Sequence, residues 1–158
     1  MSNDIFVKID GIEGEAQDTM HPGAIEVTSW NWNIRQEARY MSGSGGGAAK
    51  ATVGDLTFIH CIDRATPNLA VFCFQGKRIS QATLTMRKAG GTPFEYLKLS
   101  MYDVVITNVN PAGGGSMAVE TVSLSFTNMK QEYFLQSVSG GSLGAVTGII
   151  DLRQFRQG

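Results

Sequence analysis

The chain has 158 residues and a formal net charge of −1 at pH 7, and only 17% of its side chains are charged, where about 25% is typical. The length fits one domain, expected to span residues 1–158, and the near-neutral charge removes the electrostatic basis of a dedicated nucleic-acid-binding protein. Because so few charges are available to cover a soluble surface, the composition raises self-assembly as a first hypothesis.

Alternation of apolar and polar residues at period two dominates the chain and is typical of half-buried β-strands. We expect strands over residues 5–9, 24–35, 53–60, 81–87, 97–106, 121–127 and 146–155. Glycine clusters separate these segments, as turns and loops require. The pattern predicts a mainly β fold, an antiparallel two-sheet β-barrel.

Two strands change their apolar face partway along. In residues 24–35, Ile25 and Val27 have one parity whereas Trp30 and Trp32 have the other, which predicts a bulge or a switch of sheets near Thr28. A second irregularity is expected near Asp103. The two tryptophans are large enough to be expected in the core, which directs three neighbours to the opposite face: Ser29, Asn31 and Asn33.

One segment has helical rather than strand signals. Thr66 is a good N-cap residue, Pro67 fits the first helical position, and Gly76 fits the position after the last turn. These signals predict one short α-helix over residues 67–75, packed beside the barrel.

The sequence offers no strong catalytic, cofactor or metal motif. The glycine-rich run at 43–51 lacks the Gly-Lys-Ser/Thr ending of a phosphate-binding loop and precedes a strand. His60, Cys61 and Asp63 are close in sequence, but without further convergent ligands they do not make a zinc site. We therefore expect no catalytic residue, no cofactor and no bound metal.

The N-terminus has no basic region followed by an apolar stretch, so no cleaved signal peptide is predicted, and no segment is long enough for a membrane span. The protein is expected to be made in the cytoplasm with Cys61 and Cys73 as thiols, and to leave the cell already folded if it leaves at all.

Charge is unevenly distributed along the chain. Residues 1–28 contain six acidic side chains and one lysine, whereas the remainder has eight acidic and 12 basic side chains. The acidic segment is either a solvated loop or the flank of a dipolar subunit that meets the basic flank of a neighbour.

Several strings together resemble the Hcp family, which forms the inner tube of the bacterial type VI secretion system. They are the opening IFVKIDGIEGE at 5–15, SWNW at 29–32, and a central block at 55–91 that includes TPNL at 66–69 and RKAGG at 87–91. The resemblance covers nearly the whole chain and is weakest from Gly140 onward.

The resemblance implies a structural protein and not an enzyme: a hexameric ring that stacks into a tube, carries effector proteins in its lumen, and is expelled from the cell to the outside. Its implied partners are copies of itself, sheath proteins, a spike protein and effectors, with no membrane insertion. Some relatives carry a toxin domain at the C-terminus, and we expect none here. The alternative is a monomeric β-barrel that binds a small ligand in a hollow interior.

Two candidate surfaces follow from combining the resemblance with the strand pattern. The glycine-rich loop is expected to contact the next ring in a stack: Met41, Ser42, Gly43, Ser44, Gly45, Gly46, Gly47, Ala48, Ala49 and Lys50. The polar strand face is expected to line the lumen and touch effectors, the alternative being that it packs on a neighbouring subunit: Ser29, Asn31 and Asn33.

Overall fold

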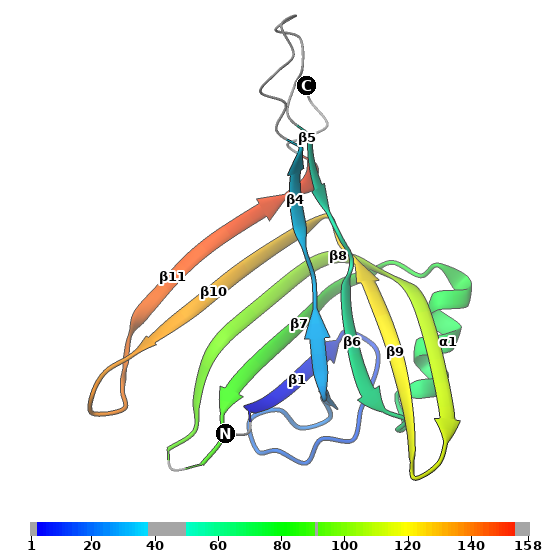
Figure 1. The fold of residues 1–158 in the computed structure, drawn as a ribbon, viewed down its shortest axis with the longest axis horizontal. Helices are drawn as coiled ribbons and strands as arrows, with labels where there is room; N and C mark the ends of the chain where they lie inside the picture. Colours follow the sequence, from blue (N-terminus) through cyan, green and yellow to red (C-terminus); the bar gives the residue numbers. More distant parts are fainter. Residues whose placement is uncertain (1–2, 38–49, 91, 154–158) are drawn as a thin grey trace, which may run out of the picture.

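The computed structural model describes residues 3–37, 50–90 and 92–153, which form eleven strands and one helix (Figure 1). No helix within these ranges is long and apolar enough to cross a membrane. The elements in chain order are β1 (Asn3–Ile9), β2 (Ile25–Glu26), β3 (Ser29–Asn31), β4 (Ile34–Glu37), β5 (Lys50–Val53), β6 (Leu56–Cys61), α1 (Thr66–Gln75), β7 (Ile79–Lys88), β8 (Phe94–Gly114), β9 (Met117–Ser125), β10 (Asn128–Gln136) and β11 (Ser142–Asp151).

Two antiparallel sheets share the long, bent strand β8. The first sheet has the order β2-β1-β7-β8-β10-β11 and uses the first half of β8, and the second has the order β8-β9-β6-β3 and uses its second half. The predicted mainly β fold with two antiparallel sheets and one short helix is confirmed. Among the described strands the barrel stays open, because β11 and β3 each pair with a single neighbour.

Both predicted irregularities are points where the chain passes between the sheets. β2 pairs with β1 in the first sheet and β3 pairs with β6 in the second, so Thr28 lies at a switch of sheets. Asp103 has φ 54, a left-handed conformation that Asp tolerates better than most residues. There β8 leaves β7 and β10 and begins to pair with β9. Arg78 donates to the Asp103 carboxylate at 2.6 Å and stabilises this corner.

The space between the sheets is filled with apolar side chains. Trp30 and Trp32 are half-buried and pack against this core, as their strand parity predicts. Trp30 Nε1 donates to the Met86 sulfur at 3.3 Å, and Trp32 meets Phe126 edge to face. A filled interior disfavours the alternative of a hollow ligand-binding barrel. The largest fully buried side chains are Phe58, Ile9, Ile12, Ile25, Leu56, Leu69, Leu84, Leu99, Met101, Ile106, Leu124 and Met129.

The helix α1 begins one residue earlier than expected. Ala65 holds the N-cap position without a side-chain cap, and Thr66 lies inside the helix, so the predicted capping role of Thr66 is wrong. Its hydroxyl instead donates to Glu120 at 3.2 Å and accepts the Asp63 N–H at 3.1 Å. Gly76 ends the helix with φ 59, and its N–H donates to the Cys73 carbonyl, as its position predicts.

Other element boundaries differ from the sequence pattern. The expected strand at 53–60 is divided by Gly54, and β8 continues through Pro111 to Gly114 where a loop is expected. Strand β10 was not predicted, because Gln131 interrupts the apolar parity of Met129 and Tyr133, and Phe134 places an apolar side chain among the polar residues of the other parity. The last strand occupies Ser142–Asp151 rather than 146–155.

Candidate functional site

The outer side of the second sheet carries a continuous polar face. Asn31 pairs with Thr57 and Ser29 pairs with Ile59, on the opposite side from the core-facing pair of Trp30 and Phe58. The same parity continues across β9 and β8, where the Thr57 and Ser123 hydroxyls lie 2.9 Å apart. The Asp55 carboxylate lies at the edge of this face, where it accepts the Thr107 hydroxyl at 2.6 Å. The polar face itself comprises Ser29, Asn31, Thr57, Asn108, Asn110, Thr121 and Ser123, with Ile59 as its apolar member.

The structure separates Asn33 from the other two predicted lumen residues. Ser29 and Asn31 are exposed on β3, whereas Asn33 is exposed between β3 and β4. The Asn33 carbonyl accepts the Gly54 N–H at 2.9 Å, and a side chain at Gly54 would collide with the Asn33 amide. Asn33 therefore belongs to the base of the β4–β5 hairpin, although it is equally accessible to solvent.

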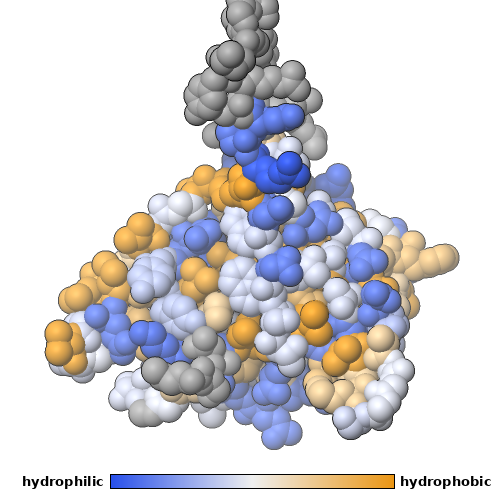
Figure 2. All heavy atoms as spheres, in the orientation of Figure 1, coloured by the Kyte–Doolittle hydropathy of each residue, from blue (hydrophilic) through white to orange (hydrophobic). Residues whose placement is uncertain are grey.

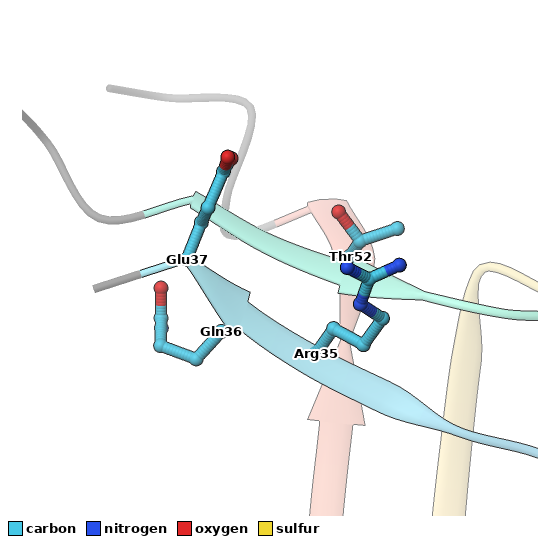
Figure 3. A pocket seen from close by; sticks show the side chains of 4 residues that line it. All are labelled: Arg35, Gln36, Glu37 and Thr52. Atoms are coloured by element: carbon cyan, nitrogen blue, oxygen red, sulfur yellow. The ribbon is translucent and has the colours of Figure 1, made fainter. Parts of the chain in front are cut away.

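The β4–β5 hairpin projects from the two sheets (Figure 1). Arg35 and Thr52 are cross-strand partners that lie beside each other, and Glu37 extends toward the end of the hairpin (Figure 3). With Gln36 they line a polar depression of about 210 Å³. The expected stacking loop lies outside the described residues except for Lys50, whose backbone pairs with Glu37. The hairpin thus presents polar side chains next to the strand ends that this loop joins.

An exposed apolar edge formed by β10 and β11 is the surface that sequence reasoning missed. In the described part of the chain β11 pairs only with β10, and Leu143, Val146 and Ile149 are 66%, 62% and 68% exposed. Figure 2 shows hydrophobic residues along this flank. Val146 pairs with Tyr133 on the same side as the buried Met129, so the core face continues beyond the core, whereas Ile149 pairs with Lys130 on the other side of the strand. An apolar edge strand of this length is typical of a surface that another chain covers.

Much of the acidic N-terminal segment is paired within the chain. Arg87 donates to Asp18 at 2.7 Å and to Asp4 at 2.9 Å, which ties the segment before β2 to the outer side of the first sheet. The hydrogen bond from Arg87 lowers the pKa of Asp18 to about 2, and hydrogen bonding to Asp18 raises the pKa of Arg87. Lys8 and Glu13 form a further ion pair at 3.4 Å. The sequence analysis considered this acidic segment either as a solvated loop or as a contact with a neighbouring subunit, and neither interpretation included these ion pairs within the chain.

His60, Cys61 and Asp63 do not converge on one point. His60 points into the core and bonds Glu120, whereas Cys61 is exposed on the other side of β6. Within residues 3–37, 50–90 and 92–153, no group of three His, Cys, Asp or Glu side chains could hold a metal ion.

An antiparallel two-sheet fold with open edges, a polar face and an apolar exposed edge defines a class of β-proteins suited to assembly with further chains. The family model described as type VI secretion system effector, Hcp, matches residues 6–133. The chain belongs to this family, and is therefore a type VI secretion protein of the Hcp kind.

Relatives along the whole chain agree with this assignment. The protein named hcp1 of Pseudomonas aeruginosa is 39% identical over 147 residues, which cover 91% of each chain. The crystal structure of Hcp1 from Salmonella typhimurium is similar with 46% identity and a TM-score of 0.81 over 98% of both chains. A type VI secretion system effector from Yersinia pestis has 39% identity and a TM-score of 0.78, covering 94% of this chain and 99% of the other.

Proposed function

We propose that the chain is the structural subunit of a type VI secretion tube: a homohexameric ring that stacks into a tube, carries effector proteins in its lumen and is exported when the surrounding sheath contracts. The role is structural and not catalytic. The structural observation that supports the proposal, in addition to family membership, is the exposed apolar edge of β10 and β11. In a ring of identical subunits, a head-to-tail contact covers this edge once per subunit.

Apolar burial is the main driving force expected at this contact. Val146 on β11 and its cross-strand partner Tyr133 on β10 are 62% and 47% exposed on the core side of the edge, and covering them favours association by a few kcal/mol, at about 25 cal/mol per Å² of apolar area. The free backbone groups of β11 offer further hydrogen bonds to a neighbouring chain. Salt should weaken such a ring only modestly, because apolar burial is not screened.

The test of assembly uses two adjacent residues on opposite sides of β11. Val146→Lys puts a charge on the core side of β11, opposite Tyr133, whereas the matched control Thr147→Lys puts the same charge on the other side, opposite Glu132. Native mass spectrometry of the full chain should find hexamers for the parent and the control, and smaller species for Val146→Lys. A monomeric parent at micromolar concentration overturns the proposed ring, and hexameric Val146→Lys removes this edge from the interface.

The polar face of the second sheet is proposed as the lumen wall. It presents hydroxyl and amide groups from Ser29 to Ser123, with the Asp55 carboxylate at its edge. Such a wall can form and release hydrogen bonds with varied protein surfaces without selecting one sign of charge. Effectors would contact Ser29 and Asn31 on β3, and Asn33 at the rim.

The loop at Met41–Lys50 is proposed as the contact between successive rings. Its support is its place between β4 and β5, which project from the body, and the polar side chains of Arg35, Gln36 and Thr52 at that end. Sheath proteins and a spike protein are proposed as further partners of the assembled tube.

A further inference from the structure

A buried network of polar side chains lies beneath the start of α1. His60 on β6 and Glu120 on β9 are paired across the second sheet on its core side, and both side chains are 0% exposed. His60 Nε2 lies 2.8 Å from Glu120 Oε1, and the Thr66 hydroxyl donates to the same oxygen at 3.2 Å. Burying two ionisable groups is costly unless they are paired, and neither the lumen nor the ring contact uses them.

The second imidazole nitrogen faces another carboxylate. His60 Nδ1 has no hydrogen-bond partner in the described part of the chain, and Asp63 Oδ1 lies 3.8 Å from it. Asp63 organises the first turn of α1, because its carboxylate accepts the Ala65 N–H at 2.8 Å and its own N–H donates to the Thr66 hydroxyl at 3.1 Å. Carboxylates from β9 and from the β6–α1 loop therefore flank one buried ring.

The protonation state of His60 changes only one of these two contacts. A neutral imidazole with its proton on Nε2 still donates to Glu120, but its Nδ1 lone pair then faces the negative Asp63 carboxylate. A second proton makes the ring a cation whose Nδ1 lies 3.8 Å from Asp63 Oδ1, within ion-pair distance. Protonation of His60 therefore changes the interaction between its Nδ1 and the Asp63 carboxylate from repulsion to attraction, and Asp63 is the residue that organises the first turn of α1.

No other described element brings a competing charge to this point. α1 contains no Asp, Glu, Lys or Arg between Thr66 and Gln75, and its one titratable side chain, Cys73, packs against the apolar core. Phe58 on β6 covers the imidazole, with ring centroids 5.8 Å apart. Arg64 is exposed, and its backbone N–H is taken by Glu15.

We propose that the protonation state of His60 controls whether the first turn of α1 is held against the second sheet, and we call this device the latch. A proton on Nδ1 ties Asp63, and with it the first turn of the helix, to the second sheet, and loss of this proton releases that turn. The position of α1, and of its exposed Phe74, should therefore change with pH. This inference does not rest on the proposed ring.

The test follows His60 and α1 together in the full-length chain. The protein has two histidines, so His21→Gln leaves His60 as the only imidazole. Its ring ¹⁵N shifts report the proton from about pH 5 to 9, while amide exchange, corrected for the intrinsic pH dependence, reports the protection of Leu69–Gly76. We expect protection of these amides to fall roughly fivefold as His60 loses the proton, the effect of one ion pair, with β1 unchanged.

Two variants separate the latch from a general loss of stability. Asp63→Asn keeps an oxygen that can accept the Ala65 N–H but removes the charge, so the pH dependence of α1 should disappear. His60→Gln offers Glu120 an amide donor that does not titrate and should have the same effect. The proposal is overturned if α1 protection is constant while His60 titrates, if His60 keeps one protonation state throughout, or if Asp63→Asn retains the parent's pH dependence. Should a variant fail to fold, the titration of the His21→Gln protein decides.

Discussion

Asn31 shows what strand parity can and cannot determine for a single residue. Its exposure on the outer side of the second sheet follows from the half-buried Trp30 and Trp32 on either side of it, and the structure confirms that direction. Parity does not say what lies opposite an exposed residue. Whether Asn31 faces a lumen or a neighbouring subunit depends on copies of the chain that the strand pattern does not describe.

Substitution of Asn31 tests the lumen assignment. Asn31→Gln adds one methylene and should leave hexamers and export intact, whereas Asn31→Trp should obstruct effectors and leave hexamers intact, because the side chain points away from the core. Native mass spectrometry and an export assay read the two properties separately. Loss of hexamers in either variant would place Asn31 at the subunit contact, and unchanged export of every effector by Asn31→Trp would remove it from the cargo surface.

The ion pair between Asp18 and Arg87 predicts that the protein loses stability at low pH. The pKa of Asp18 is about 2 in the folded protein, against an ordinary value of 3.8, because Arg87 donates to it. A depressed folded pKa contributes stability above the unfolded value, and this contribution is lost as the pH falls from about 4 to 2. Asp18→Asn should therefore reduce the steepness of the fall in Tm over that range.

The control for this prediction is Glu26→Gln, which removes one negative charge from an exposed position on β2. Calorimetry of both variants and the parent across the acid range makes the comparison. Equal slopes for Asp18→Asn and the parent would show that the contact between Arg87 and Asp18 contributes nothing to stability in solution.

At the scale of elements, sequence reasoning succeeded where one signal dominated. The switches near Thr28 and Asp103 appear as breaks in parity, and the end of α1 follows from Gly76. It failed at β10, because Gln131 and Phe134 interrupt the alternation of apolar and polar residues there. It also missed the pairing of His60 with Glu120, since residues 60 positions apart leave no local pattern.

The end of α1 yields a prediction about backbone strain. Gly76 has φ 59, and a Cβ there would meet nothing within 4 Å, so the cost of Gly76→Ala comes from the backbone alone. We expect a loss of about 1 kcal/mol in the free energy of unfolding, measured in urea, and a smaller loss for Gly76→Asn. Gly113→Ala is the control because its φ is ordinary and its Cβ would meet only Ala118, at 4.0 Å. Equal stabilities for Gly76→Ala and Gly113→Ala would contradict the argument.

At the scale of the whole molecule, ring formation and ring stacking should be separable. The apolar edge of β11 and the loop after β4 are on different elements, and β4 pairs with β5 independently of β10 and β11. Deletion of residues 43–47 should therefore leave hexamers intact and abolish tubes, as seen by native mass spectrometry and electron microscopy. Tubes of normal length from the deletion variant would refute the stacking role of this loop.

The continuity of β8 has a mechanical consequence. This strand of 21 residues runs through both sheets, with β7, β10 and β9 bonded along its sides. A force that pulls the sheets apart along β8 loads many backbone hydrogen bonds in parallel and in shear, whereas peeling a terminal strand breaks them one after another. The two sheets should thus yield to tension only at high force, with the β10–β11 hairpin detaching first.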